Sequence, residues 1–246
     1  MEAALCKGAV SSCVKSLLAL FGPVRPPQGG KKKGEPMKKK TILFDLDGTL
    51  LPMDQDAFTR GYFKLLAQKL APHGYDPAAL VDNIWAGTAA MVGNDGKRTN
   101  EAAFWDRFAA LYGEQVREDI PLFDAFYRQE FQQAKVFCGF TPKARAAVEA
   151  CKAAGHRVAL APETFAWYTT YENIGYCKPN PDYYREILRY LDCRAEDCLM
   201  VGNDVEEDMM AAQAAGLSVF LLTDCLLNRK EKDISSYPQG DFDALL

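Results

Sequence analysis

The chain has 246 residues, of which 48% are hydrophobic and 25% are charged. These are ordinary values for a globular protein, and they exclude a disordered chain, a collagen and a disulfide-packed miniprotein. The net charge of -4 is unevenly distributed, because residues 1–40 carry a net charge of +7 and residues 41–246 one of -11. The acidic body argues against binding of nucleic acid through a broad basic face.

Residues 1–36 differ in composition from the rest of the chain. Prolines and glycines surround three consecutive lysines at 31–33, which favours a disordered or linker-like extension that is dispensable. Residues 17–21 faintly resemble a secretory signal, but the apolar stretch is short and lacks a clean cleavage site. We expect the functional domain to begin at Met37, directly before the first predicted strand.

The remaining composition predicts a cytoplasmic protein. No apolar run reaches the roughly 18 to 20 residues that a membrane-spanning helix needs, so no membrane partner is expected. The eight cysteines form no C-x-x-C pair and no spacing typical of a zinc site or a disulfide framework. We therefore expect reduced thiols. The oligomeric state stays open.

An apolar strand is predicted at residues 41–44, and it runs directly into the string DLDGTL. Carboxylates at the end of a buried strand are costly to desolvate unless a cation compensates them. Gly48 permits the sharp turn that would aim Asp45 and Asp47 into one crevice. The pattern indicates a bound cation, and the alternative is an ordinary Asp/Gly turn after a strand.

A second buried strand is predicted at residues 198–201, and it leads into a further acidic motif containing Asp204 and Asp208. Mg²⁺ prefers octahedral oxygen sites built from carboxylates, waters and phosphate, which suits these residues. The alternative is acidic capping of a helix over residues 205–215, which Gly216 would end.

A lysine lies in the string GYCKPNP at residues 175–181. Lys178 is suited to neutralise crowded carboxylates as a point charge. Asn180 and Pro181 then read as the N-cap and first residue of a helix. Its apolar face would contain Tyr184, Ile187, Leu188 and Leu191.

Together these three motifs make the chain resemble the haloacid dehalogenase superfamily over about residues 37–246, and most members are magnesium-dependent phosphatases. The resemblance implies that Asp45 attacks phosphorus and that Asp47 acts first as acid and then as base. It implies further that Lys178 offsets phosphoryl charge. Mg²⁺ would be held by Asp45, Asp47, Asp204 and Asp208. The substrate would be a small phosphorylated metabolite. An acid at position 47 argues against the dehalogenases themselves, because they lack it.

The remaining family motif, a Ser or Thr after the second core strand, is missing from its expected place. A helix at 142–154, begun by Thr141 and ended by Gly155, leads into a strand at 157–161. Pro162 stands where the hydroxyl is expected, and Thr164 is the nearest substitute. The next apolar run, 167–171, follows after about five residues, whereas a parallel crossover needs roughly a dozen. We interpret this as the loss of a helix and its flanking loops.

Two competing hypotheses follow. The missing hydroxyl and short crossover favour a catalytically impaired scaffold of the same fold, with a binding or regulatory role. A mutase or phosphonate hydrolase of the superfamily is less well supported, because no lysine is clearly assigned to Schiff-base chemistry. Lys64, Lys69 and Lys97 remain individual candidates for that role.

Residues 52–140 show helical periodicity, which in the family is typical of a cap that closes over the catalytic crevice. Residues 87–100 form its most polar stretch, either a substrate-facing loop or a solvent-exposed connection. The core would comprise residues 37–51 and 141–246, with a further strand at 217–222 and the start of a helix at 241. The predicted fold is α/β: a doubly wound, mostly parallel Rossmann-like sheet with an inserted helical cap. The apolar stripes are formed by Tyr62, Leu66 and Leu70, then Val81, Ile84, Trp85 and Val92, then Phe104, Phe108, Leu111 and Tyr112, and last Leu122, Phe123, Phe126, Tyr127 and Phe131.

Overall fold

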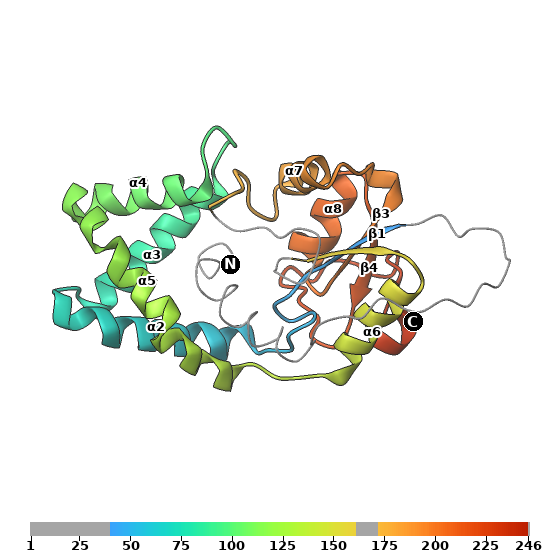
Figure 1. Cartoon of the computed structure of the whole chain (residues 1–246), viewed down its shortest axis with the longest axis horizontal. Coiled ribbons are helices and arrows are strands. Elements are labelled where there is room, and N and C mark those ends of the chain that lie inside the picture. Colours follow the sequence, from blue (N-terminus) through green and yellow to red (C-terminus); the bar gives the residue numbers. More distant parts are fainter. Residues whose placement is uncertain (1–39, 161–171, 246) are drawn as a thin grey trace, which may run out of the picture.

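A computed structural model of the chain describes residues 40–160 and 172–245. These residues contain a five-stranded sheet whose neighbouring strands all pair in parallel. The sheet lies at one end of the molecule and a group of helices at the other (Figure 1). In sheet order the strands are β2 (Arg157–Leu160), β1 (Thr41–Phe44), β3 (Cys198–Gly202), β4 (Ser218–Leu222) and β5 (Gln239–Gly240).

Helices cover both faces of this sheet. Successive side chains of β1 alternate, so that Ile42 and Phe44 pack into one apolar cluster and Leu43 into another. The first cluster includes side chains of α6 (Pro142–Ala153) and α9 (Phe242–Leu245). The second includes α7 (Pro181–Leu191), the π-helical segment η6 (Val205–Met210) and α8 (Ala211–Ala214). The predicted doubly wound α/β class is therefore confirmed.

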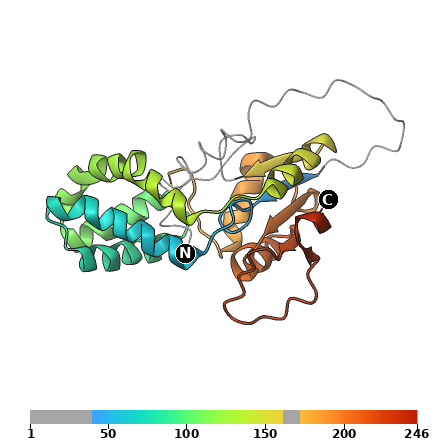
Figure 2. The ribbon, with the colours of Figure 1, turned by 90° about the horizontal axis from the view of Figure 1, so that it is seen from below.

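The residues between β1 and α6 are helical, as predicted, and form a separate group of helices beside the sheet (Figure 2). Phe108, Phe126 and Phe131 are fully buried among other aromatic rings. The insertion contains α2 (Gln55–Leu70), the 3₁₀ turn η2 (Ala71–His73), α3 (Pro77–Val92), α4 (Asn100–Tyr112), the 3₁₀ helix η3 (Glu114–Asp119), α5 (Ile120–Arg128) and the 3₁₀ helix η4 (Glu130–Phe137). Its apolar side chains belong to the same cluster as one face of the sheet, and Leu50 and Leu51 belong to that cluster too.

Two parts of the predicted insertion differ from the structure. Val92 and Leu111 were expected in the apolar stripes, but they are 39% and 40% exposed, because each lies at the end of its helix. The stretch 87–100 is only partly the exposed connection that was expected, since residues 95–99 are exposed but Asn94 and Asn100 are buried, and its role as a substrate-facing loop stays a prediction. Its first residues belong to α3. Asn100 donates to the carbonyl oxygen of Tyr176, in the segment that precedes Lys178, and Asn94 donates to Asn100.

Local sequence signals account for most element boundaries. The side chains of Thr141, Asn180 and Asp204 accept backbone N–H bonds at the starts of α6, α7 and η6. The helix predicted at 205–215 forms, but its first part is π-helical, with Met209 N donating to Asp204 O. The 3₁₀ turn η5 (Ala195–Asp197) and the short strand β5 were not predicted.

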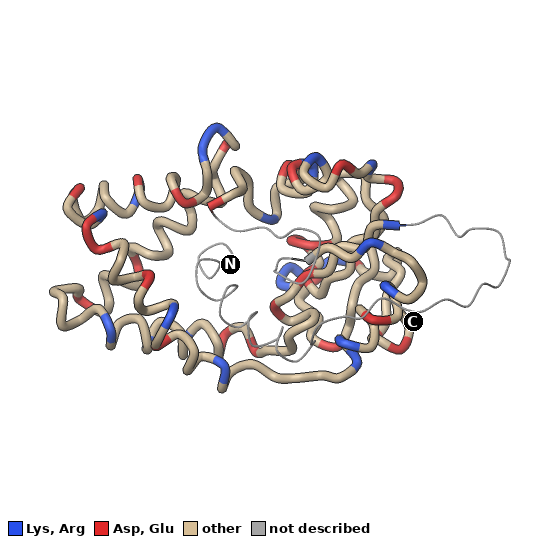
Figure 3. The backbone as a smooth tube through the Cα atoms, in the orientation of Figure 1, with Lys and Arg blue, Asp and Glu red and all other residues tan. Residues whose placement is uncertain are grey.

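Several expectations concern residues outside the described ranges. These are the extension 1–36, Pro162, Thr164 and the run 167–171, so the crossover after β2 stays an expectation. Within residues 40–160 and 172–245, no helix is long and apolar enough to cross a membrane. Basic and acidic positions are interspersed along the described chain (Figure 3).

Candidate active site

The carboxyl ends of β1 and β3 lie side by side. Phe44 pairs with Val201, and the next residue along, Asp45, donates its backbone N–H to the carbonyl oxygen of Val201 at 2.9 Å. The motif after β1 therefore meets the motif after β3 at one edge of the sheet. In open parallel sheets this edge is where ligands bind.

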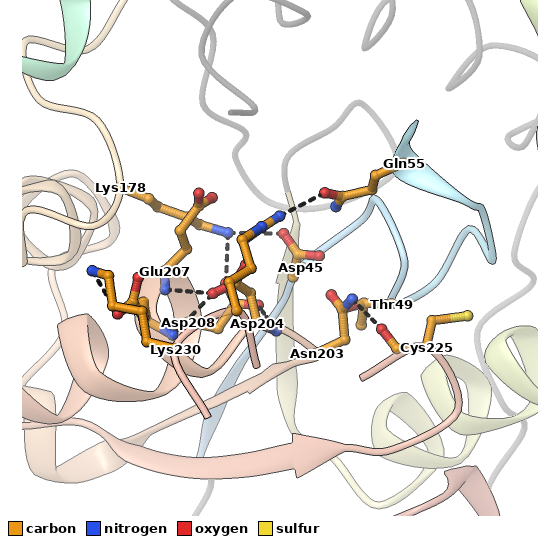
Figure 4. A network of polar contacts seen from close by, with 12 residues as sticks. Asp45, Thr49, Gln55, Lys178, Asn203, Asp204, Glu207, Asp208, Cys225 and Lys230 are labelled. Atoms are coloured by element: carbon orange, nitrogen blue, oxygen red, sulfur yellow. Dashed lines mark hydrogen bonds and ion pairs between the residues drawn. The ribbon is translucent and has the colours of Figure 1, made fainter. Parts of the chain in front are cut away.

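Lys178 links these two motifs (Figure 4). Its Nζ lies 2.8 Å from Oδ1 of Asp45 and 2.7 Å from Oδ1 of Asp208. The three side chains are only 9%, 5% and 1% exposed, respectively. Buried carboxylates need a partner of opposite charge, and one ammonium serves both here. The structure thus brings together one predicted residue from each of the three motifs.

Asp208 is fixed by several further contacts. Its Oδ2 accepts from the backbone N–H of Asp204 at 3.1 Å, and the Tyr184 hydroxyl lies 3.3 Å from its Oδ1. A Cβ atom on Gly202 would lie 2.2 Å from the same Oδ2, so this position requires glycine. Asp208 is therefore oriented by its neighbours. Tyr184 was predicted only as an apolar helix residue, and its hydroxyl role carried no sequence signal.

A turn after β1 packs closely against Asn203. Gly48 has a φ of +83°, and a Cβ atom there would lie 2.4 Å from Nδ2 of Asn203. The hydroxyl of Thr49 donates to Oδ1 of Asn203 at 3.0 Å, and Nδ2 of Asn203 donates to the carbonyl oxygen of Cys225 at 2.6 Å. Asn203 thus joins the turn that carries Asp47 to the loop after β4.

The electrostatic environment shifts two of the carboxyl groups. Burial raises the pKa of Asp47 to about 7; the neighbouring Asp45 adds to this rise, and Lys178 opposes it. Burial also raises the pKa of Asp208, an effect that Lys178 partly offsets. An acid with a pKa near neutrality can both donate and accept a proton at physiological pH.

Asp204 has two different sets of partners. Its Oδ1 accepts from the backbone N–H groups of Glu206 and Glu207, both at 2.9 Å. Its Oδ2 accepts from the guanidinium of Arg229, whose other terminal nitrogen lies 2.9 Å from Oε1 of Gln55. Sequence reasoning missed Arg229, because it lies in a polar segment without periodicity.

The donors at this edge suit a magnesium ion. Oδ2 of Asp45 is buried and has no hydrogen-bond partner among the described residues, which is costly unless a cation neutralises it. Carboxylate oxygens are the hard ligands that Mg²⁺ prefers. Within the described ranges no three His, Cys, Asp or Glu side chains already form a metal-binding group. Oδ2 of Asp45 is therefore the oxygen of this cluster that is best placed to meet a cation, whereas both oxygens of Asp204 and of Asp208 accept hydrogen bonds from protein.

Four other predicted positions lie away from this centre or outside the described residues. Thr164 belongs to the part of the chain that the structure does not describe. Lys69 pairs with Glu130 at 2.7 Å within the insertion. Lys97 forms an exposed pair with Asp95, and Lys64 is exposed on α2. Within the described residues, none of these three lysines forms a hydrogen bond or ion pair with the site carboxylates.

Fold and site define an α/β protein whose centre combines strand-end carboxylates with a buried lysine. A family model for haloacid dehalogenase-like hydrolases matches residues 39–216, which is most of the chain. The chain belongs to this family of hydrolases.

Two curated relatives carry phosphatase names. Pyrophosphatase PpaX of Bacillus thuringiensis is 26% identical over 186 residues, covering 73% of this chain and 81% of the relative. Glyceraldehyde 3-phosphate phosphatase of Methanothermobacter thermautotrophicus is 38% identical over 64 residues. That second match covers 26% of this chain and only 28% of the relative's length.

Solved structures share the fold. A 2-haloacid dehalogenase from Pseudomonas syringae pv. Tomato is similar with a TM-score of 0.52 and 19% identity, covering 84% of this chain and 96% of that chain. A haloacid dehalogenase-type phosphatase from Thermococcus onnurineus has a TM-score of 0.50 and 14% identity, with coverage of 82% and 93%. At this level of identity the likeness establishes architecture alone.

Proposed function

We propose that the protein hydrolyses small phosphate monoesters through a phosphorylated Asp45, with Mg²⁺ as cofactor. The observation that carries this proposal is the buried bridge from Lys178 to Asp45 and Asp208 at the carboxyl edge of the sheet. It holds Asp45 by one oxygen and leaves the other without a protein partner among the described residues. A carboxylate so held is positioned to act as a nucleophile.

In the first step a carboxylate oxygen of Asp45 attacks phosphorus, and the bond from phosphorus to the ester oxygen breaks. Asp47 in its acid form gives its proton to the departing alkoxide, so an alcohol leaves. In the second step water attacks the phosphorus of the acyl phosphate and yields its proton to ionised Asp47. Phosphate departs and the carboxylate of Asp45 is restored. A pKa near 7 suits Asp47 to both roles.

The charge of the phosphoryl group needs compensation throughout. Lys178 would supply one positive charge that is preorganised and protected from water. Bound Mg²⁺ supplies the remaining charge stabilisation as a Lewis acid. Asp45 and Asp204 would hold the ion, and Asp208 would position Lys178 and the backbone of Asp204.

Two features support small phosphate esters as substrates: the names of the curated relatives and the helical insertion. The names of the two curated relatives specify glyceraldehyde 3-phosphate and pyrophosphate, which are both small phosphate compounds. The helices of residues 52–140 would serve as the cap that limits access to the crevice. The impaired-scaffold alternative draws no support from the described residues or from the comparisons. The cytoplasmic location stays a prediction.

A panel of phosphate esters, assayed for phosphate release with and without Mg²⁺, tests the proposal. Asp45→Asn is the blank, because it keeps the shape and removes the nucleophilic charge. We expect turnover only in the wild type with Mg²⁺. Acid quench during turnover, followed by peptide mass analysis, is expected to show one phosphoryl group on Asp45. Wild-type turnover no greater than that of the blank contradicts the proposal.

A further inference from the structure

Arg229 connects the acidic motif after β3 to the first helix of the insertion. One terminal nitrogen donates to Oδ2 of Asp204, and the other lies 2.9 Å from Oε1 of Gln55. Gln55 is the first residue of α2, directly after the N-cap Asp54. A single guanidinium therefore spans from a candidate metal ligand to the start of the inserted helices.

The loop that carries Arg229 is anchored on both sides. Leu227 exchanges backbone hydrogen bonds with the acidic motif, to the carbonyl of Asn203 at 2.8 Å and from the N–H of Val205 at 2.9 Å. Asn228 binds both backbone groups of Lys232 at 2.8 Å through its side chain. Arg229 lies between these two sets of hydrogen bonds, so the conformation of the loop holds it close to Asp204.

The two oxygens of Asp204 are used differently. Oδ1 already accepts two backbone N–H groups, which leaves Oδ2 as the oxygen that a metal ion would take. Arg229 occupies that oxygen with a charge-assisted hydrogen bond, and the Asp204 side chain is only 8% exposed. A guanidinium and a divalent cation repel each other when they share one oxygen.

We propose that Arg229 and Mg²⁺ compete for Oδ2 of Asp204, so that Arg229 sets the affinity of the metal site and metal binding frees Gln55 at the start of α2. Arg229 is thus a positioning residue that couples the metal site to the insertion. The inference rests on the proposed function only in taking Asp204 as a metal ligand. It goes beyond that function by assigning a role to a residue of the loop after β4.

Magnesium titration of the full-length protein by calorimetry, without substrate, tests the competition. We expect Arg229→Gln to bind Mg²⁺ about tenfold more tightly than the wild type, because one charge-assisted bond no longer has to break. Lys230→Gln is the matched control. This variant removes a neighbouring positive charge, which pairs with Glu206 at 2.8 Å and not with Asp204. We expect its Mg²⁺ affinity to differ from that of the wild type by less than about threefold. Equal or weaker Mg²⁺ binding by Arg229→Gln overturns the proposal.

Hydrogen exchange of the first turns of α2 tests the coupling. In the wild type, Mg²⁺ is expected to speed exchange there, because Gln55 loses its partner. In Arg229→Gln and in Gln55→Ala, exchange is expected to be fast already and unaffected by Mg²⁺. Slower or unchanged exchange in the wild type on adding Mg²⁺ contradicts the coupling. Gln55→Ala leaves the pair with Asp204 in place and so guards against a folding defect in the Arg229 variant.

The outcomes separate this inference from the proposed function. Magnesium-dependent phosphatase turnover, with unchanged Mg²⁺ affinity in Arg229→Gln, rejects the competition and leaves the function intact. Failure of the wild type and Arg229→Gln alike to bind Mg²⁺ overturns the inference. The role of Asp45 as nucleophile is tested separately, by comparing phosphate release by the wild type and by Asp45→Asn.

Discussion

The hydroxyl of Tyr184 lies 3.3 Å from Oδ1 of Asp208, the same oxygen that accepts a hydrogen bond from Nζ of Lys178 at 2.7 Å. It also donates to the carbonyl oxygen of Glu207 at 2.9 Å. Burial raises the pKa of this hydroxyl well above its usual value, so it stays a protonated donor. Tyr184 lies on the apolar face of α7 and packs in the core, and its hydroxyl also orients Asp208 in the site.

Replacing Tyr184 by Phe keeps the ring and removes this donor. We expect the free energy of unfolding to fall by about 1 to 2 kcal/mol and kcat to fall several-fold, because Asp208 keeps its bond to Lys178. Urea unfolding and steady-state kinetics measure the two effects. Tyr190→Phe is the control, because this half-exposed residue donates its hydroxyl to the carbonyl oxygen of Asn173 at 3.2 Å. Equal effects of both variants on kcat would contradict the orienting role.

The raised pKa of Asp47 predicts a dependence of stability on pH. Its folded pKa of about 7 lies above the ordinary value of 3.8, so folding favours the protonated form. The stability that the protonated form of Asp47 contributes is fully present below pH 3.8 and is lost as the pH rises through 7. Asp47→Asn removes the titration. We expect its stability advantage over the wild type to be larger at pH 8 than at pH 5 by roughly 1 to 3 kcal/mol.

Urea unfolding at the two pH values, with chelator present, measures this difference for Asp47. A constant difference between wild type and variant would show that burial does not shift this carboxyl group. The same pKa predicts that kcat/KM, measured with Mg²⁺, declines above pH 7, because the first step needs the acid form of Asp47.

Gly48 and Gly155 offer a matched pair of substitutions. Both have a left-handed φ, +83° and +84°, but a Cβ atom would meet Asn203 only at Gly48; at Gly155 nothing lies within 4 Å. Each change to Ala costs about 1 kcal/mol from the backbone conformation. We expect Gly48→Ala to cost about 1 to 3 kcal/mol more and to abolish most activity. Unfolding free energies that agree within error would contradict the close approach to Asn203.

Asn100 ties the α3–α4 loop to the segment before Lys178. Its side chain donates to the carbonyl oxygen of Tyr176 at 3.0 Å, and its backbone N–H to that of Ile174 at 3.0 Å. We expect Asn100→Ala to lower the free energy of unfolding by about 2 kcal/mol, because buried polar groups lose partners, and to lower kcat. Denaturation curves and kinetics at saturating substrate measure these effects.

Asn94→Ala separates stability from positioning in this network. Asn94 donates to Oδ1 of Asn100 at 3.0 Å and to the carbonyl oxygen of Arg98 at 2.9 Å, and among the described residues it forms no hydrogen bond to the segment before Lys178. Its loss is expected to reduce stability while kcat stays within about twofold of the wild type. An equal fall in kcat for Asn94→Ala and Asn100→Ala would show that activity falls because the fold is destabilised, and not because Lys178 is displaced.

The sequence predicted the elements whose signals are local. Thr141, Asn180 and Asp204 cap helices as expected, and the apolar runs that precede both acidic motifs are buried parallel strands. Because these motifs end neighbouring parallel strands, their meeting followed from the α/β class. The roles assigned to Asp45, Asp47, Lys178, Asp204 and Asp208 stay proposals. Thr164 lies outside the described residues.

The missed features depend on contacts between distant segments. Arg229 reaches Asp204 only because Leu227 pairs with the acidic motif, and no periodicity marks that pairing. The exposure of Val92 and Leu111 depends on where each helix stops, which a stripe of apolar residues does not define. The π-helical start of the segment after Asp204 follows from a hydrogen-bond register that propensity does not specify.

Apolar side chains of β1, of α2 and of Leu50 and Leu51 between them belong to one cluster. Heating is therefore expected to melt the sheet and the inserted helices together, as a single calorimetric peak. Excising the helices would bare the sheet side of that cluster to water and invite aggregation. The insertion is therefore expected to contribute to the stability of the sheet, and neither part is expected to fold alone.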